Sequence, residues 1–135
     1  MENQDISVEK QEFQIVEDPT PADIDKELTF LANTMARLQN IVAGYRKEKA
    51  IRETTLKRTK AIAVIKHRQD SPAEFRNAQI DLDPDYSTAR DRMQEIENML
   101  TVAQGRLAGY EAQFVAVRKQ AELKKMELQQ LGVAN

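Results

Sequence analysis

The most regular feature of the sequence is a run of apolar positions in its second half, spaced alternately three and four residues apart. The run continues without a slip for more than six heptads, from Tyr86 to Leu131. Residues at this spacing lie on one face of an α-helix, and the seven-residue period is typical of coiled coils. The sequence therefore predicts one long heptad helix whose apolar face carries Tyr86, Ala89, Met93, Ile96, Leu100, Ala103, Leu107, Tyr110, Phe114, Val117, Ala121, Leu128 and Leu131.

The first half of the chain opens with the same spacing, at Leu28, Leu31, Met35, Leu38, Val42 and Tyr45. Beyond Tyr45 this register meets Lys49 and Arg52. A second register becomes apolar instead, at Ile51, Thr55, Ile62 and Ile65. We therefore expect the apolar face to rotate around the helix, as it does at a stutter. No helix breaker lies between Pro21 and Asp70, so the sequence predicts a helix of about 50 residues, roughly 70 Å long.

Three sites carry the same signal for a helix start, a capping side chain directly before a proline. They are Thr20-Pro21, Ser71-Pro72 and Asp83-Pro84. The cap accepts a hydrogen bond from a free backbone N–H, and proline at the first helical position loses no donor that the helix needs. Ser71 and Glu74 also have the spacing of a capping box. Gly132 is a natural C-terminal stop.

These elements predict an all-α fold, a long antiparallel helical hairpin resembling a coiled coil, with a short connecting helix. We divide the chain into a flexible acidic arm (1–18), a first long helix with a basic second half (19–69), a linker with a short helix (70–84) and the long heptad helix (85–135).

Two helices alone bury too little apolar surface, so we expect the hairpin to form a homo-oligomer. The residues expected to make the subunit contacts lie on the heptad face. They are Tyr86, Met93, Ile96, Leu100, Leu107, Tyr110, Phe114, Val117 and Leu128.

The sequence contains no Gly-rich phosphate loop, no Ser/His/Asp set and no paired catalytic carboxylates, so we expect a protein that is not an enzyme. The chain has no cysteine, and its only histidine, His67, lies in a run of lysines and arginines, as a solvated surface residue would. Asp81, Asp83 and Asp85 alternate, but they lack the glycine and distal glutamate of a calcium loop. We therefore expect no metal, no cofactor and no small-molecule substrate.

The N-terminus lacks the basic and apolar regions of a signal peptide, and no apolar run is long enough to span a membrane. The absence of cysteine is compatible with a reducing compartment. We expect a cytoplasmic protein, in the host cytoplasm if a phage encodes it, and no membrane partner.

Charge is strongly segregated along the chain although the net charge is only −2. Residues 1–27 carry nine acids and two lysines, and residues 69–99 carry eight acids and three arginines. Between them, residues 45–68 carry two acids against nine bases, which are Arg46, Lys47, Lys49, Arg52, Lys57, Arg58, Lys60, Lys66 and Arg68. A partner experiences these segments rather than the net charge.

The basic segment has two competing explanations. One is neutralisation within the protein or between subunits, by the acidic arm or by the acidic linker. The other is a polyanionic partner, for which nucleic acid is the natural choice, because clustered Lys and Arg release counterions from a phosphate backbone. Aromatic residues for base stacking are nearly absent, which favours contact with the backbone rather than reading of the bases.

The order of these segments resembles that of the phage recombination-mediator (UvsY) family. An amphipathic helix ends in a Lys/Arg-rich stretch with Leu56-Lys57-Arg58 at its centre, and an irregular polar segment and a long C-terminal helix follow. The resemblance covers residues 25–131 in outline. It implies a small helical protein that loads a recombinase onto single-stranded DNA, with Lys57, Arg58 and Lys60 at the DNA and 86–131 building the oligomer.

Two functions from different classes therefore remain. The first is a non-enzymatic oligomeric accessory protein that binds single-stranded DNA through its basic helix, with a recombinase as a further partner. The second is a structural or chaperone-like coiled-coil assembly factor that acts through protein–protein contacts only, in which the charged blocks set the register between subunits.

Overall fold

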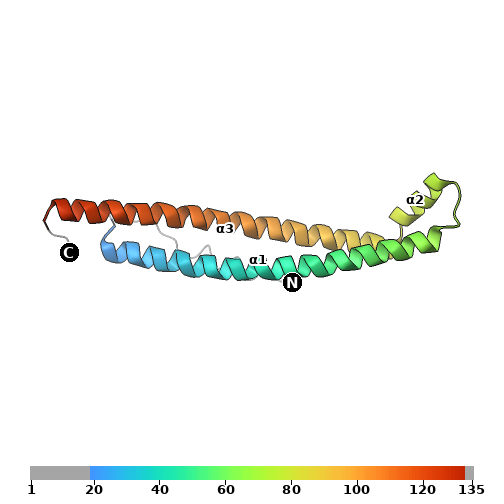
Figure 1. The fold of residues 1–135 in the computed structure, drawn as a ribbon, viewed down its shortest axis with the longest axis horizontal. Helices are drawn as coiled ribbons and strands as arrows, with labels where there is room; N and C mark the ends of the chain where they lie inside the picture. The colour runs from blue at the N-terminus through green and yellow to red at the C-terminus, as the bar shows by residue number, and fades with distance from the viewer. Residues whose placement is uncertain (1–18, 133–135) are drawn as a thin grey trace. The chain divides into compact units, whose positions relative to one another are not determined.

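The computed structural model describes residues 19–132, and within that range the chain is helical without strands. It contains α1 (Pro21–His67), α2 (Ala73–Asp81) and α3 (Pro84–Gln130), shown in Figure 1. The all-α fold predicted from the sequence is confirmed, and one long helix packs on another. The predicted acidic arm, residues 1–18, lies outside the described residues.

Two of the three predicted helix caps are formed. The Asp23 backbone N–H donates to Thr20 Oγ1 at a distance of 3.2 Å. The Thr20 backbone N–H donates in return to Asp23 Oδ2 at 2.9 Å, which completes a reciprocal capping box. At the start of α3, Asp83 Oδ1 accepts hydrogen bonds from the backbone N–H groups of Asp85 (3.1 Å) and Tyr86 (3.2 Å). Both long helices thus begin at the prolines that the sequence indicated.

The cap predicted at Ser71 is wrong. Pro72 occupies the N-cap position of α2 in an extended conformation, and no side-chain hydrogen bond caps this helix. Because α2 begins one residue later than the Ser-Pro pattern predicts, Ser71 lies outside the position from which a cap reaches the first turn.

The other predicted boundary, at the end of α3, is confirmed. Gly132 has a φ of 70 degrees, in the left-handed region that glycine adopts without strain. Its N–H donates to the carbonyl of Gln129 at 3.0 Å. Gly132 therefore ends α3 in the way that a C-terminal glycine usually does.

The chain forms two compact units, each of which combines part of α1 with part of α3. The first unit contains, among the described residues, 19–41 and 103–132. Its core joins Ile24 and Leu31 of α1 to Val117 of α3, with partly buried side chains packed around them: Leu28, Phe30, Tyr110, Phe114 and Ala121. Burial of these apolar side chains is the main term that stabilises the unit.

The second unit comprises residues 42–102 and includes α2. On α1, the buried apolar side chains of this unit are Val42, Tyr45 and Ala63, and none lies between Tyr45 and Ala63. Ile80 of α2 is also buried, and α3 contributes Ala89, Ile96 and Leu100.

The heptad face predicted on α3 is the face that α3 buries. Each of its apolar positions from Tyr86 to Leu128 is buried or partly buried, whereas Leu131 is 67% exposed. The nine residues predicted to make subunit contacts belong to this face. Ile96, with no exposed surface, and Val117, at 7%, are already covered within one chain, so their role in an oligomer stays a prediction.

The predicted rotation of the apolar face on α1 is wrong. The register of Leu38 and Tyr45 continues inward through Lys49, Arg52, Leu56, Thr59 and Ala63, all of which are buried or partly buried. The second register points to solvent: Ile51 is 54% exposed, Ile62 is 56% exposed and Ile65 is 62% exposed. The reason is geometric. Because α3 keeps an unbroken heptad face, the helix packed on it must present an unbroken register as well, whatever residues that register holds.

Candidate binding surface on the basic helix

Helix geometry divides the nine bases of residues 45–68 into two groups. Lys49 and Arg52 occupy the inward register and are partly buried. The other seven side chains are exposed to solvent: Arg46, Lys47, Lys57, Arg58, Lys60, Lys66 and Arg68.

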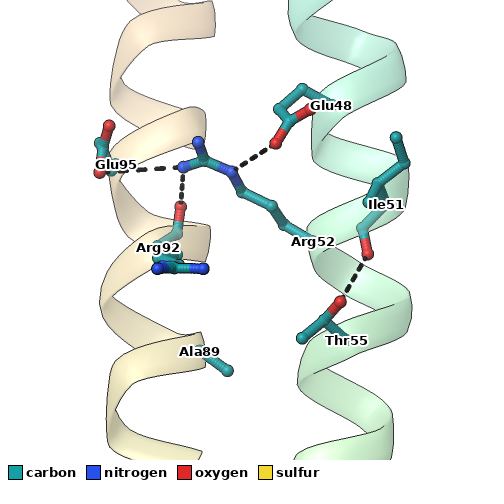
Figure 2. A pocket seen from close by; sticks show the side chains of 7 residues that line it. All are labelled: Glu48, Ile51, Arg52, Thr55, Ala89, Arg92 and Glu95. Atoms are coloured by element: carbon teal, nitrogen blue, oxygen red, sulfur yellow. Dashed lines mark hydrogen bonds and ion pairs between the residues drawn. The ribbon is translucent and has the colours of Figure 1, made fainter. Parts of the chain in front are cut away.

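Arg52 occupies a position of the inward register and forms hydrogen bonds to both long helices. Its Nη1 donates to the carbonyl oxygen of Arg92 on α3 (2.7 Å), and its Nε donates to Glu48 Oε1 (3.0 Å). Figure 2 shows the guanidinium reaching from α1 across to α3, where Glu95 Oε2 lies 3.8 Å from Nη1. The Arg52 side chain is only 15% exposed. Its charge-assisted hydrogen bonds hold the helices together, and it is poorly placed to meet a nucleic acid.

A hollow of about 290 Å³ opens beside Arg52. Figure 2 shows its lining residues on both helices, with Ile51 and Thr55 on α1 and Ala89, Arg92 and Glu95 on α3. Among its lining residues, Ala89 is small and Arg52 is polar, so neither fills the space as a bulky apolar side chain would.

Most of the exposed bases keep their charge unpaired within residues 19–132. Lys57 Nζ lies 3.7 Å from Glu53 Oε1, and an exposed pair of this kind contributes little to stability. Lys66 Nζ lies 3.3 Å from Asp83 Oδ2. The described residues provide no ion-pair partner for the remaining exposed bases, Arg46, Lys47, Arg58, Lys60 and Arg68. The structure therefore leaves a cluster of positive charge on the outside of the second unit.

Isoleucines lie among these cations on the exposed side of α1. Lys47, Ile51, Arg58, Ile62 and Ile65 follow each other at intervals of four, seven, four and three residues, so they line one side of the helix. All five are exposed. We call these five residues the outer face of α1. The spacing of these five residues is visible in the sequence. Their exposure is known only from the structure, which shows that α1 packs on α3 through a different register.

His67 belongs to a polar cluster where α1 ends and α3 begins. Its Nδ1 lies 2.9 Å from Asp70 Oδ2 and its Nε2 lies 3.7 Å from Asp83 Oδ2, and the side chain is 17% exposed. The backbone N–H of Tyr86, and then Lys66, hold the pKa of Asp83 below its usual range. The description of His67 as a solvated surface residue is therefore wrong. The spacing of His67 and Asp70, three residues apart, was the signal in the sequence.

Metal ligands do not cluster in the part of the chain that the structure describes: no group of three or more His, Cys, Asp or Glu is arranged to hold an ion. The alternating aspartates have separate roles. Asp83 caps α3, and the Asp81 carbonyl accepts a hydrogen bond from Arg90 Nη2 (2.6 Å). No helix among residues 19–132 combines the length and apolar character needed to cross a membrane.

No protein-family model matches the chain, and neither a curated protein nor a solved structure is significantly similar to it.

Proposed function

We propose that this protein is a non-enzymatic, oligomeric helical accessory protein that binds single-stranded DNA through the exposed bases of α1. The observation that carries the proposal is the set of cations without ion-pair partners in the described chain, among them Arg46, Arg58 and Lys60. Exposed cations distributed along and around one helix suit a flexible phosphate backbone, because binding releases the counterions condensed on it.

The role of the bound protein follows from its resemblance to recombination mediators, namely loading a recombinase onto the DNA in the cytoplasm. The exposure of each side chain supports some of the DNA-contacting residues that the sequence suggested more than others. Lys57, Arg58 and Lys60 are exposed, whereas Arg52 uses its donors within the chain. We therefore assign Arg52 to the scaffold and the exposed bases to the DNA.

The antiparallel hairpin is part of the same proposal. In the second unit, Lys66 of α1 contacts Asp83 at the start of α3, and Arg52, further back along α1, contacts Arg92 and Glu95, further along α3. Contacts that advance along one helix as they retreat along the other support an antiparallel pair.

The test is the affinity for a fluorescent single-stranded oligonucleotide as a function of salt. We expect six phosphate contacts, from Lys57 and the five exposed bases without ion-pair partners, to give an affinity loss of about three hundredfold between roughly 50 and 200 mM salt. The triple variant Lys57→Ala, Arg58→Ala, Lys60→Ala should weaken binding at low salt and reduce the logarithmic salt slope by about 2.

A matched control removes three exposed bases from α3 in the first unit, Arg118→Ala, Lys119→Ala and Lys125→Ala. This variant changes the net charge by the same amount, so it should keep most of the affinity. Equal losses in both triple variants, or an unchanged affinity in the first, would reject the assigned surface.

The second candidate function, an assembly factor without a nucleic-acid partner, is favoured by the exposed isoleucines Ile51, Ile62 and Ile65. A phosphate backbone gains nothing from aliphatic side chains, whereas a protein surface can cover them. A native mass measurement with and without oligonucleotide separates the two functions. Assemblies that change with salt and ignore the oligonucleotide support the assembly factor.

A further inference from the structure

The outer face of α1 has the composition of a protein-binding surface as well as that of a charged one. Ile51 and Ile62 are each more than half exposed, and Lys47 and Arg58 lie beside them on the same side of the helix. At one border, Ile51 and Thr55 also form the lip of the hollow beside Arg52. A partner for this face must supply apolar side chains and negative charge together.

A second copy of α1 does not meet this requirement. Packing the outer face on itself about a twofold axis would bring Ile51 opposite Ile62 of the other copy, but Lys47, Arg58 and their basic neighbours would face like charges. The acidic part of α3 does not meet it either, because its large apolar residues, Ile96 and Leu100, are already buried in the second unit.

Residues 1–18 have the required composition. They contain six acids and one lysine, and the apolar residues Phe13, Ile15 and Val16 lie together near the end of the segment. Acidic side chains occur on both sides of this apolar group, among them Glu12 and Glu17. This arrangement suits a face on which cations flank isoleucines.

The segment must come from another copy of the chain. Thirty residues of α1 separate Pro21 from Ile51, which is about 45 Å along the helix. The five residues from Val16 to Pro21 span at most about 18 Å when fully extended. The apolar group of residues 13–16 therefore does not reach Ile51 of its own chain.

We infer that residues 1–18 of a second copy dock on the outer face of α1, with their acids against Lys47 and Arg58 and with Phe13, Ile15 and Val16 against Ile51 and Ile62. The contact links copies of the chain through a surface that the packing of α1 on α3 leaves open. It accounts for the acidic segment and for the exposed isoleucines at once.

The absence of cysteine makes a direct test possible. One full-length chain carries Gln14→Cys, and a second carries Thr54→Cys, at an exposed position between Ile51 and Arg58. The control chain carries Thr101→Cys on α3. Like Thr54, Thr101 is exposed and donates its hydroxyl to the carbonyl four residues earlier, so the two substitutions remove the same interaction.

After mixing at micromolar concentration and mild oxidation, we expect the Gln14→Cys chain to cross-link with Thr54→Cys at least about tenfold more than with Thr101→Cys, because docking raises the local thiol concentration. Adding Lys47→Glu and Arg58→Glu to the Thr54→Cys chain should reduce the yield to that of the control. Adding Ile51→Ser and Ile62→Ser instead should do the same, with the helical circular dichroism unchanged in both.

Equal yields with the two threonine positions would overturn the inference. So would preferential cross-linking of Thr54→Cys with itself, which would identify α1 of the second copy as the occupant. The experiment contains no nucleic acid, so its outcome is independent of the DNA-binding test.

Discussion

The two halves of α1 differ in whether their large apolar residues are buried or exposed. In the first unit, the inward register holds Ile24, Leu31 and Leu38, and no large apolar side chain of residues 21–41 is strongly exposed. In the second unit, the inward register holds Lys49 and Arg52, while Ile51 and Ile62 point to solvent. In each half, the buried residues of α1 follow the same three-and-four spacing along the sequence. The comparison teaches that the partner's heptad face, rather than local hydrophobicity, decides which side of α1 is buried.

The largest expected change in the free energy of unfolding comes from truncating one aliphatic residue in each half of α1. Leu31 has no exposed surface, whereas Ile62 is 56% exposed. Leu31→Ala should therefore lower the free energy of unfolding by about 2–5 kcal/mol. Ile62→Ala should change it by less, within about 0.5 kcal/mol of the parent chain. Urea unfolding followed by circular dichroism measures both, and a large loss for Ile62→Ala would restore the rotated register that the sequence suggested.

The next effect concerns the cation in the inward register. Arg52→Met keeps the long aliphatic stem but removes the charge-assisted hydrogen bonds to the Arg92 carbonyl and to Glu48, so we expect the free energy of unfolding to fall by about 1.5 kcal/mol. Its acidic neighbour Glu95 is largely exposed and remains solvated without the arginine. Leu38 is fully buried in the other half, and Leu38→Arg should lower the free energy of unfolding by more than about 3 kcal/mol. Equal effects in unfolding experiments would show that the two halves do not differ.

The cap of α3, in the second unit, should make the free energy of unfolding depend on pH. The pKa of Asp83 is lowered in the folded chain, chiefly by the Tyr86 backbone N–H, so the cap stabilises the fold above the unfolded-state pKa. This stabilisation is lost as the pH falls from about 4 through the lower folded-state pKa. Asp83→Asn keeps a capping oxygen without the charge.

The Asp83→Asn variant should therefore show a weaker loss of urea-unfolding free energy between about pH 5 and pH 2. The corresponding variant at the cap of α1, Asp23→Asn, is the matched comparison, because Thr20 lowers the pKa of Asp23 in the same way. If the Asp83→Asn chain keeps the full acid sensitivity of the parent, the cap is not the group that titrates.

The smallest effect uses glycines in the helices of each unit. Gly44 on α1 and Gly109 on α3 both have open space where a Cβ would lie. Each substitution by Ala should raise the free energy of unfolding by about 0.5–1 kcal/mol through helix propensity alone. A destabilised or differently assembled Gly109→Ala chain would instead indicate that another helix packs closely on this face in the oligomer, as a sedimentation measurement would reveal.

Much of the fold was predictable from local sequence. Thr20 and Asp83 specify their helix starts because a cap and the following proline act within one turn, independently of the rest of the chain. Ser71 does not cap its helix, because α2 begins one residue later than the Ser-Pro pattern predicts and Pro72 takes the N-cap position. The buried face of α3 was predictable because a regular heptad leaves one apolar face to bury.

The candidate surface was predictable only in composition. The sequence identified the nine bases, but it could not separate Arg52, which spans to Arg92, from Arg58, which is exposed, because the two differ in register and not in residue type. It also missed the contacts of His67 with Asp70 and Asp83, because Asp83 lies beyond α2 in the sequence and comes close to His67 only in the folded chain.

The sequence by itself determined that this chain is helical, where its long helices begin, and which face of α3 is buried, because caps and heptads act through neighbours along one helix. The tertiary structure alone decided which face of α1 is buried. That choice depends on packing against α3, and in the second unit it leaves two cations partly buried and the isoleucines exposed, against the hydrophobic pattern of α1 itself.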